Sequence, residues 1–302
     1  MRWLRHGQVL EPPRLGDWAV SHAAVPLVRQ DDTRLEMLFS PRDESGRSHT
    51  ARGELVLSED GAELRPANEP VLRPGPLGAF DDSGAMGACL VRRSDREYLY
   101  YIGWQRGVTV PFTTFIGCAI STDGGRSFDR VSPAPVLGRS KDDPFLATSP
   151  WVLVEEERWR MWYASGVRWT LTAAGPKHEY RIVYAESNDG LAWQPTGHVC
   201  IDFASAAEHA IARPCVIRDA DRYRMWFSCR GDVYRIGYAE SQDGLTWDRD
   251  DSSGGLSPSG DGWESTSVEY PCVFDHGGRR LMLYNGNGYG ETGIGLATLE
   301  TH

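Results

Sequence analysis

Acidic side chains recur at one place in the sequence, six or seven residues before a Pro or Gly that opens an apolar segment. They are Asp81, with Asp82 beside it, Asp143, Glu208 and Glu264. Carboxylates held close together raise one another's pKa, which separates proton donors from proton acceptors. Cleavage of a glycosidic bond uses such a pair, one carboxyl as acid and the other as base or nucleophile. The predicted catalytic residues are Asp81, Asp82, Asp143 and Glu208. For each of them a turn-capping role is the alternative.

The loops beside the same apolar segments are rich in side chains of the kind that bind sugars. Aromatic faces stack on the apolar faces of sugars, while Arg, Asn and Asp form paired hydrogen bonds with hydroxyl groups. The predicted substrate-binding residues are His22, Arg42, Asp43, Trp104, Arg213, Arg230, Trp263, Glu264, Tyr270, Asn285, Asn287 and Tyr289. We expect Arg213 to anchor an anion or a hydroxyl group, with a structural ion pair to Glu208 as the alternative.

Other kinds of chemical site are not indicated. The histidines are dispersed and lack the spacing of a zinc site. No G-x-S-x-G nucleophile motif occurs, and the glycine-rich segment 285–290 lacks the lysine and the following helix of a phosphate loop. We therefore predict no cofactor and no bound metal, and leave open only a structural cation in a channel.

The elements that must position these residues are repeated β-strands. Five times, a strand ends in an aromatic or apolar triplet and is followed by a loop and a second strand. The triplets are Met37–Phe39, Tyr100–Ile102, Met161–Tyr163, Met225–Phe227 and Met282–Tyr284. Four of the second strands run into a Ser-x-Asp-Gly turn, whose aspartates (Asp60, Asp123, Asp189 and Asp243) we interpret as structural. A period of about sixty residues built from strands is typical of radial β repetition.

We predict an all-β, five-bladed β-propeller formed by residues 1–302 as a single domain, with four antiparallel strands in each blade. The expected blades are 21–75, 78–140, 141–203, 204–256, and 257–300 together with 1–12. The fifth repeat stops after its third strand, at Leu299, whereas Trp3 opens a segment that looks like a fourth strand. Pairing of this N-terminal strand with the last blade would close the ring and cover the sheet edge. The innermost strands would line a central channel, with the site on the rim where they begin.

Composition limits the partners and the compartment. The formal net charge of −10 disfavours nucleic acid and anionic membrane surfaces. The six cysteines form no C-x-x-C pair, so we expect buried free thiols, which suit a reducing compartment. The N-terminus shows no signal peptide, and no stretch approaches the ~20 apolar residues that span a bilayer. We predict a cytoplasmic protein whose partner is a small molecule or an oligosaccharide, and leave the oligomeric state open.

The repeated phrase Met-Trp-Tyr followed by Tyr-Ala-Glu-Ser-x-Asp-Gly-x-x-Trp resembles the five-bladed β-propeller glycoside hydrolases, the group that contains families 43, 32, 62, 68 and 130. The sequence is most similar to uncharacterised members found beside polysaccharide and O-antigen genes. These share Arg42-Asp43, Glu208 with Arg213-Pro214, and the segment Tyr284–Gly290.

The resemblance implies an acid from each of three blades: a base or nucleophile, a pKa-modulating aspartate and a general acid. Because His22 stands where the first blade would carry its aspartate, the set would be shifted to blades two, three and four. Asp81 or Asp82 would then be the base or nucleophile, Asp143 the modulator and Glu208 the acid.

The predicted function is that of a carbohydrate-active enzyme, a glycoside hydrolase or transglycosidase. One alternative is a glycan-binding propeller without catalysis, and another is a propeller recruited to a different small-molecule biosynthetic reaction such as phosphorolysis. The segment Ser121–Phe128 resembles the Asp-box of sialidases, although five repeats argue against their six-bladed fold. The sugar, the linkage and the stereochemical outcome stay open.

Overall fold

The computed structural model describes residues 1–31, 34–58 and 61–300. The protein is made almost entirely of β-strands arranged in antiparallel sheets, as predicted. The strands fall into five groups, which we call units 1 to 5. Among the described residues no helix is long and apolar enough to cross a membrane, since the two α-helices have four residues each.

Units 1 to 4 each contain four consecutive strands. Unit 1 holds β2 (Ser21–Gln30), β3 (Leu35–Arg42), β4 (Ala51–Leu57) and β5 (Ala62–Pro66). Unit 2 holds β6 (Gly84–Arg93), β7 (Arg96–Arg106), β8 (Phe112–Ser121) and β9 (Asp129–Arg130). Unit 3 holds β10 (Ala147–Glu155), β11 (Arg158–Thr172), β12 (Gly175–Ser187) and β13 (Gln194–Ile201). Unit 4 holds β14 (Ala210–Arg218), β15 (Tyr223–Arg230), β16 (Tyr234–Ser241) and β17 (Asp248–Arg249). A parallel bridge between Tyr180 and Ala210 joins units 3 and 4 into one sheet.

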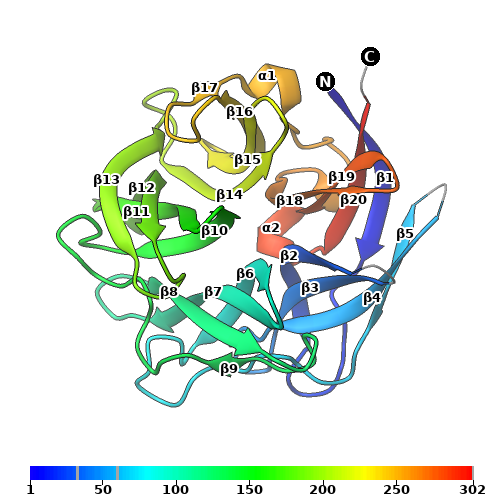
Figure 1. Ribbon diagram of the computed structural model, residues 1–302, viewed down its shortest axis with the longest axis horizontal. Helices are drawn as coiled ribbons and strands as arrows, with labels where there is room; N and C mark the ends of the chain where they lie inside the picture. Colours follow the sequence, from blue (N-terminus) through cyan, green and yellow to red (C-terminus); the bar gives the residue numbers. More distant parts are fainter. Residues whose placement is uncertain (32–33, 59–60, 301–302) are drawn as a thin grey trace.

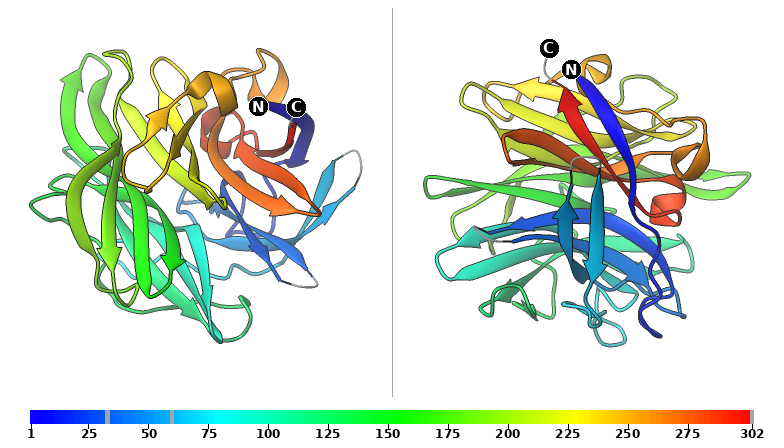
Figure 2. Two further views of the ribbon diagram at one scale, coloured as in Figure 1. Left: turned by 45° about the horizontal axis from the view of Figure 1, so that its top comes forward. Right: turned by 90° about the vertical axis from the view of Figure 1, so that its right-hand side faces the viewer.

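Unit 5 combines the two ends of the chain. It holds β18 (Glu269–His276), β19 (Arg279–Asn285), β20 (Ile294–Glu300) and the N-terminal β1 (Arg2–Leu10). Strand β1 pairs antiparallel with β20, with Trp3 opposite Leu299, and the two lie side by side in Figure 2. Trp3 is buried, and its indole N–H donates to the carbonyl of Gly254 at 2.8 Å. The N-terminal strand therefore covers the edge that β20 would otherwise expose.

The sheets are arranged radially, with β2, β6, β10, β14 and β18 nearest the centre (Figure 1). Each of these inner strands contacts the next one, and β18 contacts β2. Three short helices lie in the connections: α1 (Asp251–Gly254), a 3₁₀-helix (Gly262–Glu264) and α2 (Asn287–Gly290). Strand alternation buries apolar cores between neighbouring sheets, and one of these cores is continuous across units 5, 1 and 2.

Each inner strand is bulged near its start, which sets the direction of the side chains at the centre. Four residues directly before a proline have left-handed backbone: Val25 (φ 53°), Ser149 (φ 52°), Arg213 (φ 53°) and Tyr270 (φ 56°). Such a conformation costs a non-glycine residue about 1–2 kcal/mol, so the rest of the sheet must enforce it. The strands also begin earlier than predicted, since β10 starts at Ala147 rather than at Pro150. A bulge that re-aims side chains in this way often lies next to a functional site.

The cysteines at the centre hold neighbouring units together. Cys89 accepts a hydrogen bond from the backbone N–H of Val152 at 3.2 Å, and Cys215 accepts one from Val273 at 3.1 Å. Trp151 bonds to the fourth unit in the same way, because its indole N–H donates to the carbonyl of Val216 at 2.8 Å. All six thiols are free and buried, which confirms that prediction.

The Ser-x-Asp-Gly aspartates are structural where they are described. Asp189 accepts the backbone N–H groups of Leu191 and Ala192, both at 2.8 Å, and Asp243 accepts the equivalent pair. Asp123 does the same in unit 2. Asp60 lies outside the described residues.

Candidate functional site

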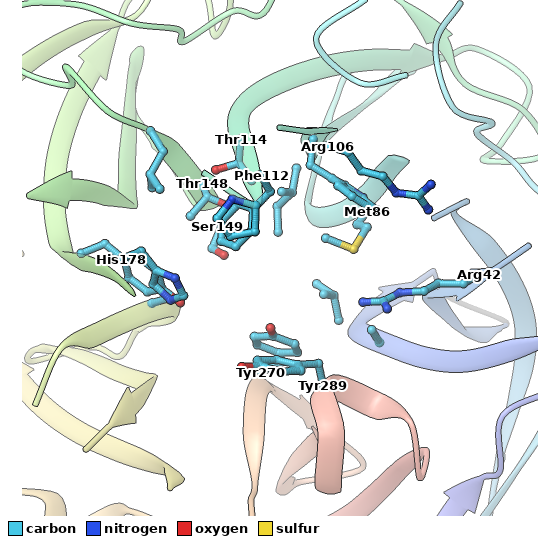
Figure 3. Close-up of a pocket in the computed structure, with 18 residues that line it drawn as sticks. Arg42, Met86, Arg106, Phe112, Thr114, Thr148, Ser149, His178, Tyr270 and Tyr289 are labelled. Carbon is cyan, nitrogen blue, oxygen red and sulfur yellow. The ribbon is translucent and has the colours of Figure 1, made fainter. Parts of the chain in front are cut away.

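A cavity of about 500 Å³ opens at the centre, where the inner strands begin. Its lining comes from all five units: Ala24, Val25, Arg42, Met86, Ile102, Trp104, Arg106, Pro111, Phe112, Thr114, Leu146, Thr148, Ser149, His178, Tyr180, Ala212, Tyr270 and Tyr289. We call it the central pocket (Figure 3). A volume of this size accommodates a small molecule or one or two sugar rings.

Aromatic rings form much of the pocket wall. His178 stacks on Tyr180 with ring centroids 4.7 Å apart and planes at 1°. Phe112 packs against His178 at 5.5 Å. Tyr270 and Tyr289 lie together on another side of the pocket, with the Tyr270 hydroxyl pointing into the cavity (Figure 3). Flat aromatic faces of this kind suit the apolar face of a sugar.

Several buried polar atoms in this wall have no hydrogen-bond partner among the described residues. They include Nε2 of His178, Oγ1 of Thr114 and Nε1 of Trp104. Burial lowers the pKa of His178 to about 4, helped by the charges of His209, Arg230 and Lys177, so this imidazole is neutral at pH 7. Buried polar groups are normally bonded, so these atoms are free to bond to a ligand or to water.

One carboxyl group lies directly behind the pocket wall, and the sequence did not single it out. Glu269 is 1 % exposed, precedes Tyr270, and accepts the backbone N–H of Tyr289 at 2.6 Å through Oε1. Its Oε2 has no partner in the described part of the chain. Burial raises its pKa to about 8, against the Tyr289 N–H and the charge of Arg230, so the carboxyl is mostly protonated at pH 7. The only feature that distinguishes Glu269 is its position directly before Tyr270, whose backbone is left-handed.

Three arginines surround the pocket. Arg42 and Arg106 line it, and Arg230 donates to the hydroxyl of Tyr289 at 2.7 Å. Burial lowers the pKa of Arg42, and the positive charge of Arg106 lowers it further. Arg106 donates to the carbonyl of Ser45. The pocket is therefore cationic and aromatic, and no residue of its lining is acidic.

The predicted acids lie elsewhere, each bonded within its own unit. Asp81 accepts the hydroxyl of Tyr101 at 3.0 Å and Nε of Arg130 at 2.7 Å. Asp143 accepts the hydroxyl of Tyr163 at 2.9 Å and lines a separate, smaller cleft. Glu264 likewise accepts the hydroxyl of Tyr284, at 2.9 Å, and Nε of Arg5 at 3.1 Å. In all three cases the tyrosine follows the acid by 20 residues.

In unit 4 the acid is bonded to arginines and not to a tyrosine. Phe227 stands at the position of the tyrosine and has no hydroxyl group. Glu208 accepts Arg249 at 2.8 and 2.9 Å, Arg235 at 2.6 Å and the backbone N–H of Ala204 at 2.8 Å. Asp82 accepts the backbone N–H of Gly78 at 2.9 Å in its turn. The structure thus does not bring the four acids together at the central pocket, and their catalytic role stays a prediction.

Arg213 does not appear in the lining of the central pocket, and its role as an anchor for an anion or a hydroxyl group stays a prediction. It is fully buried, and its guanidinium donates to the carbonyls of Ala88 at 2.7 Å and Pro26 at 2.9 Å. It therefore links unit 4 to units 1 and 2 through their inner strands. The pairing with Glu208 is wrong, since that carboxylate binds Arg235 and Arg249 instead.

The other predicted binding residues divide into two sets. Arg42, Trp104, Tyr270 and Tyr289 line the central pocket, with Arg230 bonded to the last of them. The remaining ones are bonded or packed within the scaffold: His22, Asp43, Trp263, Asn285 and Asn287. Asn285, for example, is fully buried and accepts the backbone N–H of Val25 at 2.9 Å. Sequence reasoning missed Arg106 and His178, which sit on β7 and β12.

One possible cation site occurs among the described residues. Glu208, Cys229 and Asp251 present their ligand atoms within 4.8 Å of one another. Arg249 bonds to both carboxylates, at 2.8 and 2.7 Å. The guanidinium thus supplies the positive charge there, and the prediction that no metal is bound stays a prediction.

No protein-family model matches the sequence. The uncharacterized proteins MT1551 and Rv1502 of Mycobacterium tuberculosis, from strains CDC 1551 / Oshkosh and ATCC 25618 / H37Rv, are each 44% identical over 303 residues. The match covers 99% of this chain and 100% of theirs. This protein belongs to the family of these two mycobacterial proteins.

Solved structures similar to this member of the family are glycoside hydrolases. One described simply as a glycoside hydrolase has a TM-score of 0.79 and 18% identity, over 99% of this chain and 92% of its own. A thermostable family-43 glycoside hydrolase has a TM-score of 0.69 and 14% identity, over 94% and 92%. The Bombyx mori GH32 beta-fructofuranosidase BmSUC1 has a TM-score of 0.64 and 15% identity, over 92% and 61%. At these identities the likeness establishes the fold, which is that of the glycoside hydrolase propellers.

Proposed function

We propose that this protein is a carbohydrate-active enzyme of the glycoside hydrolase type, which binds and cleaves a glycoside in the central pocket. The observation that carries the proposal is one protonated carboxyl, Glu269, placed behind an aromatic pocket at the end of the inner strands. The fold of its structural neighbours supports the same assignment. We infer that units 1 to 5 are the blades of a five-bladed propeller closed by β1; the closed series of contacts between inner strands and the β1–β20 pairing support this.

Glu269 is the proposed proton donor to the leaving oxygen of the glycoside. A general acid must hold its proton near the working pH, and a pKa of about 8 satisfies this requirement. Because its carboxyl lies behind Tyr270 and Tyr289, it can reach a ligand only after Tyr289 shifts. Tyr289 is 38 % exposed and its backbone is left-handed, with a φ of 61°.

His178 is the proposed proton acceptor. It is neutral at pH 7, and its Nε2 has no partner among the described residues of the wall. In the proposed step a water attacks the anomeric carbon and gives its proton to His178 Nε2, while the glycosidic bond breaks and its oxygen takes the proton of Glu269. Charge and atoms balance without a cofactor.

The cytoplasmic location, like the exclusion of nucleic acid and membrane partners, stays a prediction.

The test compares Glu269→Gln with the conservative variants of the acids that the sequence favoured, Asp143→Asn and Glu208→Gln. A panel of aryl glycosides first identifies a substrate for the wild-type chain. We expect Glu269→Gln to lower kcat by roughly 10²- to 10⁴-fold, the usual contribution of a general acid, with a similar KM. If Glu269→Gln retains full turnover and Glu208→Gln loses it at unchanged stability, the acid is Glu208 and the present assignment is wrong.

A second candidate is glycan binding without catalysis. It is favoured by the absence of Asp and Glu from the pocket lining, since glycosidases normally place two carboxyl groups at the scissile bond. Titration calorimetry with the same panel separates the two functions. Binding without turnover by the wild-type chain supports the second candidate, whereas turnover that depends on Glu269 supports the first.

A further inference from the structure

We propose that the ligand of the central pocket carries an anionic group, a carboxylate or a phosphate, held by Arg42 and Arg106. This inference rests on the proposed function and deepens it, because it names the charge of the glycoside. Elsewhere in the described structure, buried arginines other than Arg213 are paired with carboxylates. Examples are Arg29 with Glu36 and Glu97, Arg160 with Glu155, Arg249 with Glu208, and Arg280 with Asp219.

The half-buried arginines of the pocket, Arg42 and Arg230, depart from this pattern. Within residues 1–31, 34–58 and 61–300, no ion pair involves Arg42, Arg106 or Arg230. A charge taken partly out of water without a partner is costly, which applies to the half-buried Arg42, whereas Arg106 is exposed. Burial lowers the pKa of Arg42, and the charge of Arg106 acts in the same direction, against Tyr270 and Glu291. An anion bound between Arg42 and Arg106 would offset the penalty at Arg42.

The two guanidinium groups are also free to bond. That of Arg42 makes no hydrogen bond to another described residue, and that of Arg106 donates only to the carbonyl of Ser45. The Arg106 guanidinium lies 5.9 Å from the ring centre of Trp104, on the pocket wall. Figure 3 shows both side chains on the same side of the pocket, with the Arg42 guanidinium pointing toward the cavity and that of Arg106 farther from its centre. A guanidinium presents a fork of N–H donors that matches the two oxygens of a carboxylate or phosphate.

The rest of the pocket provides for the neutral part of the ligand. Thr114 Oγ1 and His178 Nε2 are buried and unpartnered in the described structure, and both belong to residues that line the cavity. The Tyr270 hydroxyl points into it. Because the whole protein carries a net charge of −10, the cationic pocket is a local feature. A local field of this kind concentrates anions at the pocket mouth.

Titration calorimetry with four probes tests the inference: D-glucuronate, glucose 6-phosphate, inorganic phosphate and D-glucose. We expect at least one anionic probe to bind about tenfold or more tightly than D-glucose, and to weaken as NaCl is raised from about 50 to about 500 mM. Preference for D-glucuronate identifies a sugar carboxylate as the source. Binding of inorganic phosphate alone identifies free phosphate, and preference for glucose 6-phosphate identifies a phosphorylated sugar.

Two variants and one control locate the anion. Arg42→Gln and Arg106→Gln should each weaken binding of the anionic probe by roughly ten- to a hundredfold and should weaken binding of D-glucose far less. Arg42→Lys should restore part of the affinity, because it keeps the charge without the fork. Arg65→Gln, on the outer strand of unit 1, should change nothing. Thermal unfolding checks that each variant is folded. If one of the two pocket variants does not fold, the other alone is enough for the test.

The inference is overturned if no anionic probe binds the wild-type chain, or if both pocket variants bind the anion as the wild type does. These results differ from a failure of the proposed function. If neutral glycosides are cleaved while no anion binds, the enzyme proposal stands and the anionic ligand is wrong. If an anion binds through Arg42 while no glycoside is bound or cleaved, the anion site stands and the enzyme proposal is wrong.

Discussion

The central pocket and the acid clusters between the strands of units 2 to 5 follow opposite rules. In the clusters, every recurring carboxylate has a tyrosine or arginine partner, as Asp143 has in Tyr163. At the pocket, Arg42 and Arg106 in the lining and the protonated Glu269 behind it form no ion pair with another described residue. A residue type that recurs at one place in every repeat is held there by the scaffold. The pocket instead depends on positions that differ, such as Glu269, whose counterparts are Ala24, Thr148 and Ala212.

The first prediction that sharpens this comparison concerns the dependence of stability on pH. The contributions of Glu269 and Glu208 to the free energy of unfolding should change in opposite directions as pH rises. The pKa of Glu269 is raised to about 8, so its folded form binds a proton that the unfolded chain has lost above its ordinary pKa near 4.5. Stability should therefore fall between about pH 5 and pH 8, by as much as a few kcal/mol. In Glu269→Gln this fall should be largely absent. Urea unfolding at each pH measures it.

An equal pH dependence in wild type and Glu269→Gln would contradict the assignment of a protonated carboxyl. Glu208 provides the contrast. Burial opposes its ionisation, but the hydrogen bonds and charges of Arg249 and the Ala204 N–H lower its pKa overall. A lowered carboxyl pKa stabilises the fold above the unfolded value, and the gain is lost as pH falls through the folded pKa. Glu208→Gln should therefore lose stability at pH 7 and little at about pH 3.

The second prediction breaks an acid cluster. Glu208→Ala removes the carboxylate that Arg249 and Arg235 share, at a site where the Glu208 side chain is 2 % exposed, and leaves Asp251 as their remaining acidic partner. We expect a loss of about 2 kcal/mol in the free energy of unfolding, because charge-assisted hydrogen bonds to a buried carboxylate are lost while Asp251 still pairs with both guanidinium groups. Glu54→Ala is the matched control, since both side chains of its pair with Arg65 are exposed and lie 4.0 Å apart. That change should cost less than about 1 kcal/mol.

The sequence predicted the scaffold better than the site, for a physical reason. The strand triplets and hairpin turns recur along the sequence, and the Trp3 segment resembles a single fourth strand. The repeated units could therefore be recognised from the sequence. The tyrosine partner of an acid cannot be recognised from such a pattern. It lies 20 residues from the acid, so the repeats must be aligned correctly before the pair can be found. In unit 2 the tyrosine partner is Tyr101, so the triplet equivalent to Met161–Tyr163 is Leu99–Tyr101, one residue earlier than predicted. Because of this error of one residue in the alignment, the pairing of Asp81 with Tyr101 was not predicted.

Part of the site was nevertheless within reach of the sequence. The rim at the start of the inner strands was expected, and Arg42, Trp104, Tyr270 and Tyr289 line the pocket there. His178 was missed because it lies on the third strand of its unit, and Arg106 was missed although Trp104 on the same strand was predicted. Their approach to the centre depends on how long β7 and β12 extend, which composition does not show.

The smallest predicted effect comes from one hydroxyl group in each region. Tyr163 donates to Asp143, which is fully buried and whose pKa burial raises. Tyr163→Phe should cost about 1 kcal/mol in urea unfolding, because the carboxyl loses a partner that water cannot easily replace. The Tyr270 hydroxyl makes no hydrogen bond to a described residue, so Tyr270→Phe should leave stability unchanged within about 0.5 kcal/mol. The same variant should weaken binding of a glycoside, because that hydroxyl faces the ligand. Equal losses of stability in the two variants would mean that the pocket tyrosine is as much part of the scaffold as its counterpart.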